Sequence, residues 1–237
     1  KGNVSMKKFK HRHDIGDFEL PERVEKDGKR YYVTPDGNLY PSITSILSQQ
    51  ENLGLEAWKE RVGKKEAKRI SKESARIGTA VHQLAEIYLS NVDFKLEKEE
   101  LKIVDTFNRL RFLLGNINNI VGLEIPLFSD ILRVAGTCDC IADYNGQLSI
   151  IDFKTSRKPK KEEWIKDYWM QTFFYKLAFE EMTGIEIQQV VILVACVDSF
   201  DVQVFKKPAK DSDEWLEKLV GIMKHFPHIT SMMHQKF

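Results

Sequence analysis

The dipeptide Asn145-Gly146 constrains this chain more than any other short feature, because it separates two runs of alternating apolar and polar residues. Such a dipeptide between alternating runs predicts a β-hairpin with a two-residue turn. A turn of this length fixes the register, so that Tyr144 pairs with Gln147 and every further pair follows by counting outward. The neighbours of each residue across the hairpin are therefore predictable before any other element is considered.

This register places Asp139 directly opposite Asp152, with Lys154 two residues further along on the same face. Cys138 and Cys140 alternate with Asp139, and we expect both to be small buried residues on the opposite face. Apposed carboxylates in buried strands repel each other and need a cation or a shared proton. The alternative is an edge hairpin with solvated charges, or a structural ion pair between Lys154 and one aspartate.

Oxygen ligands of this kind suit a hard divalent cation, and Mg²⁺ and Mn²⁺ are the natural candidates. A lysine beside such an ion is able to stabilise the negative charge that develops on a phosphoryl group. The hairpin therefore favours metal-dependent chemistry on a phosphate.

Composition excludes several classes of protein without selecting one. The chain has 237 residues, of which 42% are hydrophobic and 30% charged, with 36 Lys and Arg against 35 Asp and Glu. It is long enough for a substantial core, and its net charge identifies no partner. No apolar run reaches the ~18–20 residues of a membrane span, and none follows the basic start as a signal peptide would. Three cysteines disfavour a disulfide scaffold and a four-cysteine cluster, so we expect an intracellular, reducing compartment.

The pattern along the chain predicts one compact α/β (α+β) domain. We expect a flexible basic arm over 1–17, a hairpin and helical region over 18–118, and a core over 119–237. The first half predicts a hairpin over 29–40, a short helix ending near residue 50, and helices over 55–90 and 97–114, with Gly63 and Gly78 as weak points. The second half predicts strands over 120–128, 132–144, 147–154, 190–197 and 201–205, and helices over 162–182 and 215–226.

Four blocks of sequence, taken in their order along the chain, resemble a known enzyme family. They are Tyr40-Pro41-Ser42-Ile43-Thr44-Ser45-Ile46-Leu47 followed by Trp58-Lys59-Glu60-Arg61, then Gly78-Thr79-Ala80-Val81-His82, then Gly136-Thr137-Cys138-Asp139 with Asp152-Phe153-Lys154-Thr155-Ser156, and finally Gln171-Thr172-Phe173-Phe174-Tyr175. Together they resemble the RecB-type branch of the PD-(D/E)XK nuclease superfamily. The first block is similar to the exonucleases of mitochondrial genome maintenance and their phage-encoded relatives.

The resemblance implies a restriction-endonuclease-like core, with a mixed central sheet flanked by helices, that hydrolyses DNA phosphodiesters with a divalent metal. The activity that it favours is that of a single-strand DNA exonuclease. The alternatives are a structure-specific endonuclease and a non-catalytic DNA-binding module. The family roles fall on His82, Asp139, Asp152 and the Phe153 carbonyl as metal ligands, on Glu124 as a ligand of a second metal, on Lys154 as the catalytic lysine, and on Gln171 and Tyr175 as residues that brace the lysine or the phosphate.

Basic residues near these blocks are candidates for DNA contacts. Arg61, Lys65, Lys68, Lys72 and Arg76 recur at helical spacing on one face leading towards His82, and Thr155, Ser156, Arg157 and Lys158 follow the catalytic lysine. Solvated charged faces are the alternative. Trp164, Tyr168 and Trp169 are candidates for base stacking or for core packing. We expect a monomer that binds DNA and no membrane, in the host cytoplasm if phage-encoded and in the mitochondrion if eukaryotic.

Overall fold

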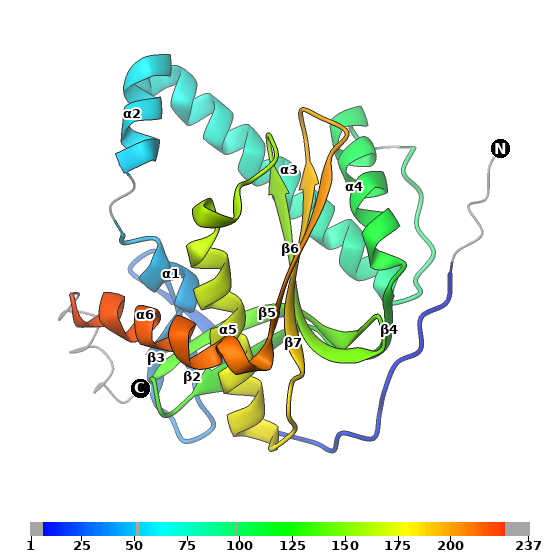
Figure 1. The fold of residues 1–237 in the computed structure, drawn as a ribbon, viewed down its shortest axis with the longest axis vertical. Helices are drawn as coiled ribbons and strands as arrows, with labels where there is room; N and C mark the ends of the chain where they lie inside the picture. The colour runs from blue at the N-terminus through cyan, green and yellow to red at the C-terminus, as the bar shows by residue number, and fades with distance from the viewer. Residues whose placement is uncertain (1–6, 51–52, 98, 226–237) are drawn as a thin grey trace.

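The structure is a computed structural model that describes residues 7–50, 53–97 and 99–225 (Figure 1). Its strands are β1 (Glu22–Lys26), β2 (Lys29–Val33), β3 (Leu39–Pro41), β4 (Ile117–Ser129), β5 (Val134–Tyr144), β6 (Gln147–Ser156), β7 (Gln189–Cys196) and β8 (Val202–Pro208). Its helices are α1 (Ile43–Leu47), α2 (Leu53–Val62), α3 (Lys64–Leu89), α4 (Leu101–Leu114), α5 (Lys166–Thr183) and α6 (Ser212–Lys224), with 3-10 turns at Glu162–Trp164 and Ala209–Asp211.

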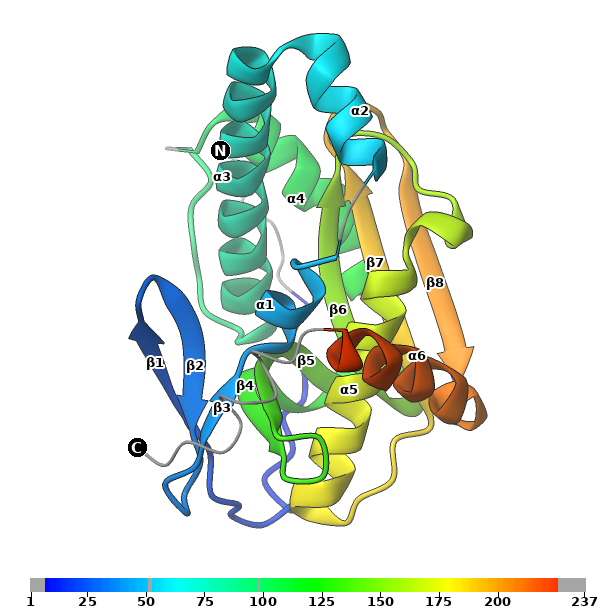
Figure 2. The same cartoon turned by 90° about the vertical axis from the view of Figure 1, so that its left-hand side faces the viewer.

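A five-stranded sheet in the order β4-β5-β6-β7-β8 forms the centre of the fold. Neighbouring strands are antiparallel except β6 and β7, which are parallel and connected through α5. Helices α3 and α4 pack on one face, and α1, α5 and α6 pack on the other (Figures 1 and 2). The expected α/β class, with a mixed sheet flanked by helices, is confirmed.

The hairpin of β5 and β6 has the predicted register. Asn145 and Gly146 both have positive φ angles, 49° and 80°, as the two central residues of a type I′ turn require. The ladder between the two strands ends at Cys140, one position short of Asp139. Beyond this point β6 continues beside β7 as far as Ser156. The hairpin therefore opens at the position where the sequence places the opposed carboxylates.

A smaller antiparallel sheet, in the order β1-β2-β3, lies against β5 (Figure 2). The hydroxyl of Tyr32 on β2 lies 2.8 Å from Oγ1 of Thr137, a hydrogen bond that joins the two sheets. The predicted hairpin over 29–40 is confirmed as β2 and β3. Strand β1 was not predicted, although Asp27-Gly28 between β1 and β2 is a turn signal of the same kind as Asn145-Gly146.

The expected helix over 55–90 is two helices in the structure. Gly63 has a φ of 84° and separates α2 from α3, since glycine adopts this conformation at little cost. Gly78 does not interrupt α3. A Cβ atom at Gly78 would lie 3.1 Å from Oγ1 of Thr155, so this glycine lets α3 approach β6 closely.

Three predicted boundaries are wrong by a few residues. Helix α4 begins at Leu101 rather than near 97, and α5 begins at Lys166, after a 3-10 turn, rather than at 162. Strand β4 begins at Ile117, so the boundary expected between 118 and 119 falls inside a strand. The helical region and the sheet share one hydrophobic cluster, which explains why no boundary divides them.

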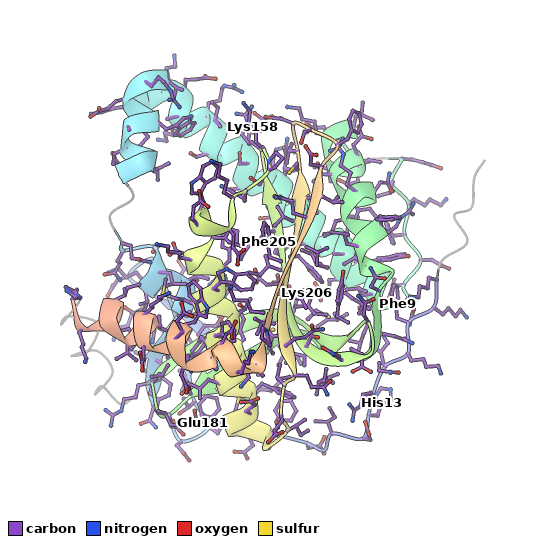
Figure 3. The ribbon with its side chains drawn as sticks, viewed as in Figure 1. Phe9, His13, Lys158, Glu181, Phe205 and Lys206 are labelled. Carbon is purple, nitrogen blue, oxygen red and sulfur yellow. The ribbon has the colours of Figure 1, made fainter. Side chains whose placement is uncertain are left out.

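Residues 7–12 pack against the domain, whereas we expected them to belong to a flexible arm. Phe9, labelled in Figure 3, is 4% exposed and its ring meets that of Tyr88 edge to face at 5.1 Å. Backbone hydrogen bonds join Arg12 and Lys10 to Ile120, beside β4. An aromatic side chain that buries its ring anchors this segment even though its neighbours are charged. The rest of the expected arm before residue 7 lies outside the described residues.

None of the helices in the described part of the chain combines the length and apolar character that crossing a bilayer requires.

Gly136 on β5 provides a test of how tightly the central sheet packs against α1 and α5. A Cβ atom there would lie 2.7 Å from Cγ2 of Ile43 and 3.0 Å from Cε1 of Tyr175. We expect Gly136→Ala to lower the free energy of unfolding by about 1–3 kcal/mol, as overpacking does. Gly221→Ala is the control, because no atom lies within 4 Å of its added Cβ, and it should stabilise helix α6 by roughly 0.5–1 kcal/mol. Urea unfolding of the two variants measures both, and equal stability of Gly136→Ala and wild type would contradict the packing.

Candidate active site

Two strands and one helix bring three potential ligands together. Glu124 on β4, Asp139 on β5 and His82 on α3 each place one ligand atom within 4.8 Å of the others. Nδ1 of His82 lies 3.6 Å from Oδ1 of Asp139. The other carboxylate oxygen of Asp139 accepts a hydrogen bond from the backbone N–H of Phe153 at 2.7 Å, which holds this side chain in the gap where the β5–β6 ladder ends.

The pleat of both β4 and β5 inverts at this site. Side chains two residues apart along a strand normally share a face. Cys138 packs in the cluster under α5, whereas Cys140 packs in the cluster under α3 and α4. On the neighbouring strand Ile125 and Leu123 divide in the same way. The prediction that the two cysteines share a face is therefore wrong, although both are buried as expected.

Glu124 lies at the inversion and has a left-handed backbone, with a φ of 49°. This conformation is uncommon for any residue other than glycine and costs free energy, which the surrounding structure must supply. Its register position lies between Leu123, opposite Cys140, and Ile125, opposite Cys138. Glu124 is therefore the residue of β4 that faces Asp139 across the sheet.

Lys154 lies at the centre of a chain of polar contacts on the α5 side of the sheet. Its Nζ lies 2.7 Å from Oδ2 of Asp152 and donates a hydrogen bond of 2.9 Å to Oε1 of Gln171. Nε2 of Gln171 donates in turn to the hydroxyl of Tyr175 at 2.9 Å. Nζ also lies 4.9 Å from the centre of the Tyr168 ring. Gln171 and Tyr175, one helical turn apart, thus form a chain of hydrogen bonds that ends on the lysine, and their bracing role in the reaction stays a prediction.

The carboxylates repel one another strongly. Burial and the charge of Asp152 raise the pKa of Asp139 to about 6. Burial, together with Asp139 and Glu86, raises the pKa of Glu124 to about 7. Burial alone would lower the pKa of Lys154, but the charges of Asp152 and Asp139 outweigh it and the pKa is raised. Lys154 therefore stays cationic at neutral pH. A further cation would stabilise the ionised carboxylates of Asp139 and Glu124.

The donor set fits a divalent metal. Oδ2 of Asp152 is buried and accepts no well-aligned hydrogen bond from any described residue, although Nζ of Lys154 lies close to it. Two further carboxylates, Glu124 and Asp139, and the imidazole of His82 converge on one another and line the same cavity as Asp152. Carboxylate oxygens suit Mg²⁺ or Mn²⁺, and a bound cation would stabilise the ionised forms of Asp139 and Glu124, which burial and neighbouring carboxylates disfavour by raising their pKa values.

A cavity of about 680 Å³ joins these groups. Of the predicted site residues, those that line it are His82, Glu124, Asp139, Asp152, Lys154, Thr155, Gln171 and Tyr175. Phe153 is buried behind it, with its ring edge to face with His82 at 6.1 Å. Helix α3 forms one wall of the cavity, from Ser74 to Glu86.

Except for Thr155, the predicted DNA contacts do not line the cavity. On α3, three basic residues lie seven positions before three residues that line the cavity. They are Lys68, Lys72 and Arg76, which precede Ala75, Thr79 and Gln83 in that order. Because seven residues make almost two helical turns, the basic residues continue the same helical face. Arg76 is bound to Glu100 at 2.6 Å and Arg157 to Asp198 at 2.6 Å, whereas the side chains of Lys68 and Lys72 are exposed. Lys158 follows the end of β6 (Figure 3).

The aromatic candidates divide between the two interpretations given for them. Trp169 is 1% exposed and packs against Trp215, so it belongs to the core rather than to a stacking surface, whereas Trp164 is exposed. Arg23 and Arg30 line the cavity but were missed. The Asp27-Gly28 turn was the signal that would have paired their two strands and placed them together.

The profile of the PD-(D/E)XK nuclease superfamily matches residues 95–235 of this sequence. The chain belongs to the PD-(D/E)XK nuclease superfamily. Nucleases of this superfamily use divalent metals, and the cluster of His82, Glu124 and Asp139 is where such an ion fits in this member. The match begins after His82, so the helix that supplies this ligand lies outside the matched region.

Similar proteins carry the name Mitochondrial genome maintenance exonuclease 1. The protein from Homo sapiens is 30% identical over 154 residues, which cover 59% of this chain and 45% of that protein. The protein from Mus musculus is 31% identical over 131 residues, 52% of this chain and 39% of that protein. The chain therefore spans less than half the length of these relatives. A crystal structure of a candidate exonuclease from Eubacterium rectale aligns with a TM-score of 0.45 and 11% identity, over 68% of this nuclease and 67% of that chain.

The raised carboxyl pKa values predict how pH changes stability. Asp139 and Glu124 have folded-state pKa values of about 6 and about 7, above their ordinary values of 3.8 and 4.5. Between these limits the folded state binds more protons than the unfolded state, so the free energy of unfolding of the metal-free protein should fall as pH rises from about 4 to about 7. Thermal or urea unfolding across this range measures the slope.

Two controls isolate the site from other titrating groups. Asp139→Asn removes one titration and should make the slope shallower, and saturating Mg²⁺ should flatten it in wild type because the ion takes the place of the protons. An identical slope for wild type and Asp139→Asn in the absence of metal would show that Asp139 is not the source.

Proposed function

We propose that this nuclease is a divalent-metal-dependent DNA exonuclease that prefers single strands. The observation that carries the proposal is the convergence of His82, Glu124, Asp139 and Asp152 with a braced Lys154 in one cavity. A non-catalytic DNA-binding module would have no need of a half-buried lysine held between an aspartate and a glutamine. The exonuclease activity is supported by the names of the similar proteins.

For the metal, we assign His82, Asp139 and Asp152 as ligands, with the carbonyl of Phe153 and with Glu124, either on the same ion or on a second one. Mg²⁺ and Mn²⁺ both suit these donors. When bound, such an ion lowers the pKa of a water molecule and polarises a phosphoryl oxygen. The hydrogen bond from Phe153 N–H leaves Oδ1 of Asp139 directed towards His82.

Lys154 supplies positive charge where negative charge develops on the phosphoryl group. Its raised pKa keeps it protonated, so it acts as a charge and hydrogen-bond donor rather than as a base. Gln171 and Asp152 hold Nζ in place, which means that little reorganisation is needed during the reaction. The hydroxyl of Tyr175 accepts a hydrogen bond from the amide nitrogen of Gln171. This contact keeps the carbonyl oxygen of Gln171 oriented towards the lysine.

Access to the site favours a single strand in this proposal. Helix α3 walls one side of the cavity, and residues of β1, β2 and α1 line another, so the metal ligands lie inside a hollow rather than on a flat face. A single strand enters such a hollow more easily than a duplex does. We assign Lys68, Lys72 and Arg76 on α3, with Thr155, Ser156, Arg157 and Lys158 after β6, to contacts with DNA phosphates.

The described cysteines, Cys138, Cys140 and Cys196, are free and buried, which supports a reducing compartment. We propose the mitochondrion for a eukaryotic source, the host cytoplasm for a phage source, and a monomer as the active form.

Digestion of end-labelled oligonucleotides tests the activity. Linear single-stranded DNA should be degraded from an end when Mg²⁺ or Mn²⁺ is present, and should remain intact with a chelator. Circular single-stranded DNA of the same sequence should survive, since it has no end. Cleavage of the circle would replace the exonuclease by a structure-specific endonuclease on the same core. No cleavage of any DNA with either metal would overturn the catalytic proposal.

Replacement of the lysine separates its role from that of the metal. Lys154→Ala should reduce the single-turnover cleavage rate by about 10²–10³-fold, the loss expected for one donor that acts on developing charge. Its affinity for Mn²⁺ should be retained, because the removed group is a cation. Lys166→Ala, an exposed lysine on α5, is the matched control and should cleave at the wild-type rate. Near wild-type cleavage by Lys154→Ala would assign the charge stabilisation to another group.

A further inference from the structure

The small N-terminal sheet contributes two arginines to the cavity that holds the metal ligands. Arg23 on β1 and Arg30 on β2 both line it. Arg23 is paired in register with Tyr32, two residues beyond Arg30, so both arginines share one face of the sheet. The hydroxyl of Tyr32 is hydrogen-bonded to Thr137 on β5. The face that carries the arginines is therefore fixed to the strand that carries Asp139.

A second cavity continues the first along this sheet. It has a volume of about 550 Å³ and shares Arg30 and Thr44 with the cavity of the metal ligands. The rest of its lining comes from the β1–β2 turn and from α1, and it is polar or cationic: Gly28, Lys29, Ser45, Ser48 and Gln49. Among the described residues no carboxylate lines it, in contrast to the acidic metal site. The two hollows form one path that changes from negative to positive charge.

The charges of Arg23 and Arg30 are not neutralised by ion pairs. In the described ranges, Arg12, Arg69, Arg76 and Arg157 each form an ion pair with a carboxylate within 3.3 Å, whereas neither of these two arginines does. Glu25 faces Arg30 in register, yet no ion pair between them is found in this part of the chain. Both guanidinium groups are exposed. Arginine in this state is a geometrically suited ligand for phosphate.

We propose that Arg23 and Arg30 bind backbone phosphates of the DNA strand next to the scissile phosphate, and that the strand continues past Thr44 into the second cavity. The inference rests on the proposed function, and it assigns one side of the strand's path. Lys68 and Lys72 lie on α3, outside the cavity but on the helical face that continues into its α3 wall. The strand thus passes between two cationic surfaces with the metal ligands between them.

Salt dependence of DNA binding tests this path. The probe is a fluorescently labelled oligothymidylate, with Ca²⁺ in place of Mg²⁺ and gel analysis to verify that it stays intact. Loss of one phosphate contact lowers the slope of log affinity against log salt by about 0.7 for a single strand. We expect that decrease for Arg23→Gln and for Arg30→Gln, and about 1.4 for the double variant.

Lys26→Gln is the matched control. It removes one positive charge from the same hairpin, at an exposed position that lines neither cavity, so its slope should equal that of wild type. Mn²⁺ affinity should not fall in the arginine variants, because removal of nearby cations favours a bound cation. An unchanged slope and affinity in the double variant would overturn the path, and so would an equal decrease in Lys26→Gln.

The failure of this inference is distinct from that of the proposed function. If wild type degrades DNA with Mg²⁺ while the double variant binds with the wild-type slope, the nuclease activity stands and the arginine path is wrong. If wild type neither binds nor cleaves DNA, the proposed function is wrong and this path with it.

Discussion

The mutual repulsion of three carboxylates at one end of the β5–β6 hairpin is the constraint on which the site depends. Asp139, Asp152 and Glu124 come from three adjacent strands, and burial raises the pKa values of Asp139 and Glu124. Lys154 neutralises part of this charge through its ion pair with Asp152. Such an arrangement is unfavourable unless a cation completes it. The chemistry of a divalent metal beside a fixed ammonium group follows from this imbalance.

The fold maintains that arrangement through close packing and local strain. Gly136 lets α1 and Tyr175 approach β5, and Tyr175 holds Gln171, which holds Lys154. Glu124 keeps a left-handed backbone where the pleat of two strands inverts together. The inversion allows acids from neighbouring strands to face one hollow while the flanking apolar residues still reach both cores. The cost of a strained residue is thus offset by packing on both sides of the sheet.

Local signals were enough to predict the hairpin and its register as far as Cys140 and Ile151, because a two-residue turn sets the pairs that follow it. They also predicted the end of α5 within one residue, where Gly184 caps the helix with a φ of 70°. What the sequence could not show depends on distant contacts: the anchoring of Phe9 on Tyr88, the burial of Trp169 against Trp215, and the inversion that separates Cys138 from Cys140. Strand β1 is different, since the Asp27-Gly28 turn that precedes β2 was a readable signal.

Direct measurement of Mn²⁺ binding by electron paramagnetic resonance tests the central claim that the crowded carboxylates form the metal site of this nuclease. Wild type should bind Mn²⁺, and Asp139→Ala should lose this binding together with DNA cleavage, whereas Glu25→Ala, an exposed acid of the N-terminal hairpin, should retain both. Undiminished Mn²⁺ binding by Asp139→Ala would place the metal elsewhere and contradict the account.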